Sequence, residues 1–304
     1  MYATSNMSTI EKATDLLPFL FMGCWNKKGE PSASVARAIT ENPITTLVLG
    51  GDNIYPEKQQ NGNDPTKFTK VYSLETLTEG IHMLHGKTIY TALGNHNVVD
   101  AILPTQLGLK EWTIPNRYYS VNFRDLTLVV IDSNLVTTDE YGSMKDWLSG
   151  IIAILKEAGK RYYYVQHDPF LSFKKNKTTA LRKFSELLAI LAEHPPVAVL
   201  CADTHNYQSG TLQIGAARIR QYVVGTGGAV PDYVAQDKGS AHTAEDVTYT
   251  MDDYITGYGY LEITPATTHF IKVEDWRSYE GKGGGKRRTK TYKKRTRSRR
   301  RHYL

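Results

Sequence analysis

Cysteine is scarce in this 304-residue chain, which contains only Cys24 and Cys201. Two cysteines cannot build the dense disulfide framework of a small secreted domain, and they fit a reducing compartment. Long apolar runs are also missing, since no stretch approaches the roughly 20 apolar residues of a membrane span. The short apolar stretch 16–22 contains a proline and follows Asp15 instead of a basic segment, unlike a secretory signal. We therefore predict a soluble, intracellular protein that does not contact a membrane.

Acidic residues are absent from one end of the chain. Residues 281–304 hold twelve Lys or Arg and no Asp or Glu. Subtracting these twelve from the total of 37 leaves 25 basic residues against 31 acidic ones in residues 1–280, so that part is mildly acidic. Three glycines at 283–285 precede a segment too highly charged to pack. We predict one folded domain over 1–280 and a disordered basic tail over 281–304.

The predicted tail has the charge density to bind a polyanion such as nucleic acid through counterion release, without sequence selectivity. The residues expected to make these contacts are Lys286, Arg287, Arg288, Lys293, Lys294, Arg295, Arg299, Arg300 and Arg301. Polybasic runs also act as nuclear localisation signals, and this composition is similar to the C-termini of some large-DNA-virus proteins. The tail therefore has two interpretations. It directs the protein to a nuclear, nucleic-acid-associated or virion location, or it is a solvated extension without a partner.

Hydrophobic residues make up 40% of the chain, and their spacing predicts strands that alternate with helices. Strands are expected at 19–22, 46–50, 88–93, 118–122, 126–131, 161–165, 197–201, 218–224, 258–263 and 269–273. Helices are expected at 33–40, 74–84, 144–158 and 178–194, and loops at 57–67 and 236–253. Early βαβ units followed by more strand predict an α/β domain with mixed sheets and outer helices.

Polar side chains of the metal-ligand type stand where five of these strands end. They are Cys24, Asp52, Asn95 and His167 after four strands, and Asp203 with His205 after the fifth. Taken singly, each is more often a turn or cap residue. The loops at the carboxyl ends of strands converge in α/β sheets, so the ordered set predicts a shared metal site.

Four segments resemble motifs of the purple acid phosphatases, which belong to the calcineurin-like metallophosphoesterase superfamily. They are Gly51-Asp52-Asn53-Ile54-Tyr55, Gly94-Asn95-His96-Asn97, Val165-Gln166-His167-Asp168-Pro169 and residues 200–208. Segments 118–120 and 225–228 are also similar to family segments, and the resemblance covers about residues 17–275. Several motifs in the family order are more specific than any one of them. The resemblance implies a four-layer α/β sandwich, in which two mixed β-sheets are flanked by helices.

The resemblance also implies an enzyme that hydrolyses phosphoric esters at a dinuclear metal centre. Asp52 would bridge the two ions, Tyr55 and His205 would bind the first, and Asn95 and His167 the second. His96 would lie beside the phosphate ester substrate and protonate the leaving oxygen or stabilise the transition state. Such a centre suits this reaction, because two ions about 3.5–4 Å apart activate water and neutralise developing charge.

Two positions depart from the family pattern. Cys24 stands where the first motif has aspartate, and Asp203 stands where the last motif has the first of two histidines. A carboxylate at Asp203 binds zinc, iron or manganese. A thiolate at Cys24 favours zinc, whereas the phenolate of Tyr55 favours ferric iron as in purple family members. The predicted cofactor is therefore two divalent or mixed-valence ions of Fe, Zn or Mn.

Two functions are consistent with these residues. The first is a metal-dependent phosphatase of the acid phosphatase type, acting on phosphoric ester bonds. The alternative is a catalytically impaired protein that retains the metallophosphatase fold, loses the first ion if Cys24 fails as a ligand, and binds a polyanion through its tail. Metal content measured together with turnover of an aryl phosphate separates the two.

Overall fold

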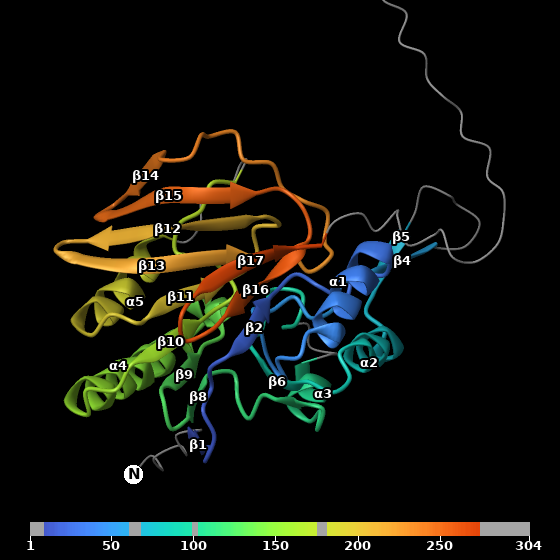
Figure 1. The fold of residues 1–304 in the computed structure, drawn as a ribbon, viewed down its shortest axis with the longest axis horizontal. Helices are drawn as coiled ribbons and strands as arrows, with labels where there is room; N and C mark the ends of the chain where they lie inside the picture. The colour runs from blue at the N-terminus through green and yellow to red at the C-terminus, as the bar shows by residue number, and fades with distance from the viewer. Residues whose placement is uncertain (1–8, 61–67, 99–102, 175–180, 274–304) are drawn as a thin grey trace, which may run out of the picture. The chain divides into compact units, whose positions relative to one another are not determined.

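The computed structural model describes residues 9–60, 68–98, 103–174 and 181–273 (Figure 1). The chain divides into two units, Met1–Glu274 and Asp275–Leu304, and the fold described here is that of the first. The predicted boundary at residue 280 and all nine basic residues assigned to polyanion binding lie outside the described residues. Within the described part, no helix is long and apolar enough to cross a membrane.

Two mixed β-sheets form the first unit (Figure 1). The six-stranded sheet has the order β17-β16-β2-β3-β6-β7, with strands Thr268–Lys272, Gly259–Ile263, Phe19–Met22, Thr46–Leu49, Thr88–Thr91 and Trp112–Thr113. The nine-stranded sheet has the order β1-β8-β9-β10-β11-β13-β12-β15-β14. Its strands are Thr9–Glu11, Tyr119–Asn122, Thr127–Val130, Tyr162–Val165, Ala198–Cys201, Ala217–Val224, Tyr207–Ile214, Val247–Ile255 and Ala241–Ala244. A separate hairpin pairs β4 (Glu57–Gln60) with β5 (Phe68–Val71).

Helices pack on the outer faces of both sheets. They are α1 (Glu30–Glu41), α2 (Leu74–Met83), α3 (Leu103–Leu107), α4 (Tyr141–Glu157), α5 (Leu181–Glu193) and the 3-10 helix η1 (Ser133–Thr137). A proline in its first turn suits the start of α1, because proline lacks the N–H that would be unpaired there. The side chain of Ser73 caps α2 by accepting a hydrogen bond from the Thr76 amide.

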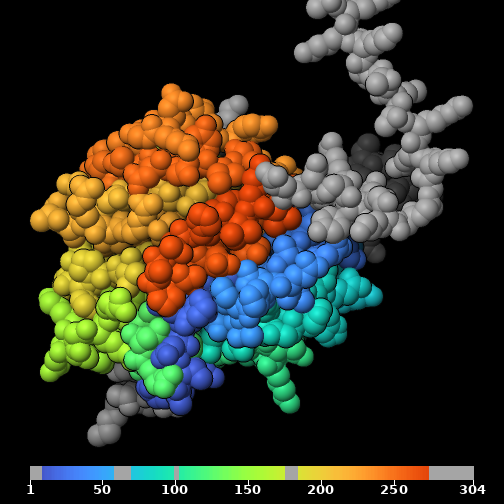
Figure 2. Space-filling model, in the orientation of Figure 1, coloured from blue at the N-terminus to red at the C-terminus, as the bar shows by residue number. Residues whose placement is uncertain are grey.

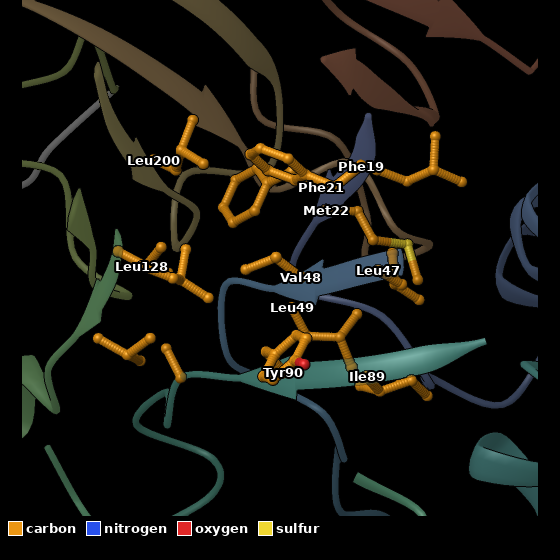
Figure 3. Close-up of a cluster of buried hydrophobic side chains, with 14 of the residues drawn as sticks. Phe19, Phe21, Met22, Leu47, Val48, Leu49, Ile89, Tyr90, Leu128 and Leu200 are labelled. Atoms are coloured by element: carbon orange, nitrogen blue, oxygen red, sulfur yellow. The ribbon is translucent and has the colours of Figure 1, made fainter. Parts of the chain in front are cut away.

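Side-chain alternation along the central strands creates two apolar layers, since successive residues of a strand point to opposite faces. Leu128 of β9 and Leu200 of β11 face the six-stranded sheet, where Phe21 and Val48 meet them (Figure 3). Their neighbours, such as Val199, belong to the second layer, which α4 and α5 cover. The predicted α/β architecture of two mixed sheets flanked by helices is confirmed.

The six-stranded sheet joins the two ends of the described chain. β16 pairs antiparallel with β2, so that Leu261 lies opposite Phe21. Figure 2 shows the result on one face, where the red-orange surface near the end of the described chain lies beside the blue surface of its beginning. This pairing holds β2 in place, and with it the loop that carries Cys24.

All ten predicted strands are present, with ends displaced by two residues at most. The loop predicted at 236–253 is wrong, because β14 and most of β15 lie within it. Alternate residues Val247, Tyr249 and Met251 are buried while their neighbours are not. The many polar residues on the other face concealed this alternation. The loop predicted at 57–67 likewise begins with strand β4, and the first three residues of the helix predicted at 178–194 lie outside the described residues.

Candidate metal centre

The carboxyl ends of five parallel strands carry the residues predicted as ligands. β2, β3 and β6 are parallel neighbours in one sheet, and β10 and β11 are parallel neighbours in the other. Backbone hydrogen bonds join the two sheets at these ends, from Gly23 N–H to the Val224 carbonyl (2.9 Å) and from Gly227 N–H to the Gly23 carbonyl (3.0 Å). The loops that follow the five strands therefore converge.

Three of the predicted ligands come together as one donor group. The ligand atoms of Cys24, Asp52 and His205 all lie within 4.8 Å of one another. The Tyr55 hydroxyl lies 3.3 Å from His205 Nε2, and its ring packs against Cys24. The group thus offers one sulfur, a carboxylate, a phenol oxygen and an imidazole nitrogen, a set that zinc or iron binds.

The backbone at this group adopts a conformation that ordinary residues avoid. Cys24, Asp52 and Asp203 have φ values of 54°, 52° and 49°, in the left-handed region. Aspartate tolerates this region, whereas at Cys24 it costs on the order of 1–3 kcal/mol and persists only where the surroundings enforce it, which is typical of active sites. Three predicted ligands share this feature, and no sequence pattern used above would have revealed it.

Two glycines of the motifs are required by close packing around Asp52. Gly51 has φ +91°, and a Cβ there would lie 2.7 Å from His167 Nδ1. A Cβ on Gly94 would approach the Asp52 amide nitrogen to 2.3 Å and His167 Cε1 to 2.8 Å. Real side chains do not tolerate such contacts with backbone atoms, so these glycines let three loops meet around one carboxylate.

His167 has an unpaired nitrogen that faces Asp52. Its Nδ1 is 2.7 Å from the Gly50 carbonyl, which fixes the proton on Nδ1. Nε2 lies 3.4 Å from Asp52 Oδ1 and, among the described residues, has no hydrogen-bond partner although it is fully buried. Metal-binding histidines characteristically have one nitrogen tied to a carbonyl and the other free for the ion. Burial lowers the pKa of His167, but the nearby carboxylates, Asp52 foremost, leave that pKa raised, so a metal ion at Nε2 would compete with a proton.

His205 is also oriented through Nδ1, but its Nε2 has a partner. Its Nδ1 is 2.9 Å from the Val230 carbonyl, and its Nε2 faces the Tyr55 hydroxyl. Burial and the positive charge of Lys174 lower the pKa of His205, which keeps the imidazole in the neutral form that ligates metals. By contrast, burial and the charge of Asp52 raise the pKa of the Cys24 thiol, so metal binding at Cys24 must displace a proton.

Asn95 and His96 lie on the loop after β6. The His96 amide donates to Asp52 Oδ1 (3.0 Å), which holds this loop against the donor group. Asn95, the residue before it, is exposed, and its assignment as a ligand of the second ion stays a prediction. The Tyr72 hydroxyl lies 2.9 Å from His96 Nδ1, and the Tyr55 ring centroid lies 4.6 Å from that of His96.

Sequence analysis missed two charged residues at this site, Lys174 and Asp232. Lys174 Nζ lies 2.9 Å from Asp232 Oδ2 and 3.9 Å from Asp203 Oδ2, and the lysine side chain is only 16% exposed. Asp232 Oδ2 also accepts the His205 amide (3.0 Å). Lys174 therefore offsets the charge that Asp203 introduces at a position where the family pattern has histidine, and Asp232 holds the His205 loop.

This ion pair predicts how Lys174 affects metal binding. Lys174→Met keeps the length of the side chain but removes the cation that competes for Asp203. The affinity for a divalent ion should rise by about tenfold, or ~1.4 kcal/mol. Calorimetric titration with Zn²⁺ or Mn²⁺ measures this, and Lys145→Met, which breaks a surface pair with Glu186, is the matched control. Weaker metal binding in Lys174→Met alone would contradict the competition.

The two cysteines have separate environments. Both are buried and free. Cys24 packs with Ala202 and Ala229 beside Tyr55, whereas Cys201 lies in the layer covered by α4 and α5. The Cys201 thiol donates to the Tyr222 carbonyl at 3.3 Å. The two thiols therefore form no disulfide, and the Cys24 sulfur stays within the donor group.

Comparisons with known proteins identify the fold. No protein-family model and no curated protein sequence matches the chain. Among solved structures, a purple acid phosphatase from yellow lupin (Lupinus luteus) seeds superposes with a TM-score of 0.61 at 12% identity. That match covers 87% of this chain and 52% of the lupin protein, so this chain spans about half of the lupin protein's length.

Two further structures match over most of both chains. A dimetal phosphatase from Danio rerio has a TM-score of 0.51 at 10% identity, covering 86% of this chain and 100% of that one. GAP50, described as the anchor in the inner membrane complex of Plasmodium, has a TM-score of 0.56 at 15% identity, with 86% of each chain covered. At such identities the likeness establishes the fold, which is metallophosphatase-like.

Proposed function

We propose that this protein hydrolyses phosphoric esters at a centre of two metal ions held by the converging loops. The observation that carries the proposal is the convergence on Asp52, where Cys24 and His205 place their ligand atoms and His167 directs an unpaired nitrogen. The fully buried His167 Nε2 has no hydrogen-bond partner among the described residues, whereas buried polar atoms normally have one, so a cation is the expected partner. The metallophosphatase-like fold supports the same conclusion.

In this proposal the donors divide between two ions. Cys24, Tyr55 and His205 would hold the first, Asn95, His167 and Asp203 would hold the second, and Asp52 would serve both. When bound, the ions supply Lewis-acid chemistry, making water nucleophilic and neutralising charge on the phosphoryl group. Water adds to phosphorus, the P–O ester bond breaks, and the alcohol leaves with one proton while phosphate remains.

His96 would act on the substrate as a hydrogen-bond donor. Burial lowers the pKa of His96 despite the opposing charge of Asp52, so the ring is neutral at neutral pH. Burial also raises the pKa of Tyr72, which keeps its hydroxyl protonated and able to donate to Nδ1. The remaining ring proton then resides on Nε2. Such a donor stabilises a phosphoryl or leaving-group oxygen as its negative charge grows.

His96→Ala should therefore lower turnover of an aryl phosphate by about 10²-fold or more while metal content stays unchanged. Tyr72→Phe, which removes only the partner of Nδ1, should have a smaller effect in the same direction. His82→Ala, an exposed histidine on α2, is the matched control. Steady-state kinetics and elemental analysis of the same samples check this. Loss of metal from His96→Ala would identify His96 as a ligand instead.

The proposed function is tested by removal and return of metal. Protein treated with a chelator should lose turnover of an aryl phosphate and regain it with Zn²⁺, Mn²⁺ or iron. Turnover that persists without metal would contradict a metal-dependent reaction, and turnover that no ion restores in protein that remains folded would favour the catalytically impaired alternative.

A further inference from the structure

A cavity of about 470 Å³ is lined in part by residues of two loops that carry the candidate metal centre. Asp168, which lines it, directly follows His167, and Val98 lies two residues after His96. Asn134, another lining residue, bonds through Nδ2 to the carbonyl of Leu93, immediately before the glycine of the His96 motif (3.4 Å). A ligand in this cavity would therefore adjoin the loops of His96 and His167.

The polar walls of the cavity are held in place by a buried carboxylate. Asp132 has no exposed side-chain surface, and its Oδ2 accepts from Arg117 Nε at 2.7 Å. Its Oδ1 accepts from the Asn134 amide (2.9 Å) and from Asn134 Nδ2 (2.7 Å). The Ser133 hydroxyl in turn donates to Asp168 Oδ2 (2.8 Å). Arg117, Asn134 and Asp168 are thus positioned before any ligand enters, which lowers the entropic cost of binding.

The charge of the cavity does not favour a second anionic group. Arg117 is its cation among the described lining residues, and Asp132 and Glu140 (3.2 Å from Nη1) already pair with that guanidinium. Asp168 adds a further carboxylate. A ligand that carries additional phosphates or carboxylates would meet more negative than positive charge here.

Most of the hydrogen-bonding groups left over are acceptors, and among the described residues the Arg117 guanidinium keeps two of its five N–H groups for a ligand. Among the described residues, Oδ1 of Asn134 and Oδ1 of Asp168 receive no hydrogen bond. The Thr137 and Thr138 hydroxyls donate to the carbonyls of Asn134 (3.3 Å) and Leu135 (2.9 Å). The Thr138 oxygen also accepts from the Glu140 amide (3.3 Å), so each hydroxyl keeps at least one lone pair for a ligand. A well-matched ligand must therefore supply donors, as a hydroxyl does, and can also accept from Arg117. Val98 and Phe184 add apolar surface to the lining.

We propose that this cavity binds the leaving group of the ester, and that this leaving group is uncharged and carries several hydroxyls. Sugar phosphates and nucleoside monophosphates share this chemistry. Their hydroxyls would donate to Asn134 and Asp168, and their carbon faces would contact Val98 and Phe184. The volume lies within the range of about 300–1,000 Å³ that is usual for small-molecule sites. The proposal rests on the proposed hydrolase function and extends it to a substrate class.

The test compares kcat/KM for a sugar phosphate, a nucleoside monophosphate, the matching nucleoside diphosphate and a simple aryl phosphate. Wild type should prefer one of the first two over the diphosphate by at least about tenfold. The measured quantity is a ratio, kcat/KM for the preferred ester divided by kcat/KM for the aryl phosphate. Thr137 is an exposed residue of the cavity, and Thr137→Trp should lower this ratio by at least about tenfold. Thr243→Trp, an exposed threonine of β14, is the control and should change neither value.

The outcomes distinguish the proposed substrate class from the proposed hydrolase function on which it rests. Hydrolysis of the aryl phosphate without preference for hydroxylated esters, or an unchanged ratio in Thr137→Trp, would overturn the substrate class and leave the hydrolase standing. Failure to hydrolyse any ester with metal present would overturn both. Independently of any variant, the free sugar or nucleoside should inhibit wild type competitively, and absence of that inhibition counts against the cavity. Whichever of the sugar phosphate and the nucleoside monophosphate has the higher kcat/KM shows whether the hydroxyls belong to a sugar or to a nucleoside.

Discussion

Asp52→Ala should abolish hydrolysis and release metal. Asp52 is 2% exposed and lies where three loops meet, within 4.8 Å of the ligand atoms of Cys24 and His205. The same carboxylate faces His167 Nε2, so its removal deprives both proposed ions of a shared anionic ligand. We expect turnover of an aryl phosphate to fall to the rate of the buffer control, and metal content per chain to fall with it.

Asp52→Asn removes the charge of the Asp52 side chain while nearly preserving its shape. Asparagine tolerates the left-handed backbone that Asp52 adopts, and its side-chain oxygen can still accept the His96 amide. We therefore expect this variant to keep its fold and still lose metal and activity. Asp146→Ala, an exposed aspartate on α4, is the matched control. An Asp52→Asn protein that keeps both its metal and its rate would show that this motif has been misassigned.

Cys24→Ala should reduce the number of bound ions from two to one and bring hydrolysis close to background. In the proposed centre the Cys24 sulfur, which lies close to the ligand atoms of Asp52 and His205, would bind the first ion, whereas His167 and Asp203 would continue to hold the second. Since burial keeps the metal-free thiol protonated and inaccessible, alkylation is a poor readout, and metal ions per chain is the better one.

Two variants make the Cys24 result interpretable. Cys201→Ala removes the other buried thiol, which lies in a different apolar layer, and should leave the metal count unchanged. Cys24→Asp introduces a side chain that tolerates the observed φ of 54° and should preserve activity while favouring manganese or iron over zinc. One ion per chain in both wild type and Cys24→Ala would contradict ligation by sulfur and the two-ion mechanism.

The parts of the fold that were predictable are those with a strong local signal. Short apolar runs such as Phe19–Met22 and Thr46–Leu49 are buried on both faces, so composition alone identified them as strands. β15 escaped prediction because only alternate residues of it are buried, and Asp252 and Asp253 give it the composition of a loop. Pairing with β12 across the nine-stranded sheet, which stabilises it as a strand, depends on residues distant in sequence.

The candidate site divides in the same way. Asp52, His167 and His205 follow predictable strands, and their motifs predicted them as ligands. Lys174 and Asp232 belong to loops with no such motif, and only the folded chain brings them to Asp203 and the His205 amide. Polyanion binding by the basic tail stays a prediction, since that segment lies outside the described residues.

X-ray absorption spectroscopy of the metal-loaded protein tests the central claim most directly. The account predicts a second metal about 3.5–4 Å from the absorbing ion. It also predicts, in the spectrum of a zinc-loaded sample, a sulfur at about 2.3 Å that disappears in Cys24→Asp. A spectrum with nitrogen and oxygen neighbours alone, and no metal–metal distance at full loading, would contradict a two-metal centre built on Cys24 and Asp52.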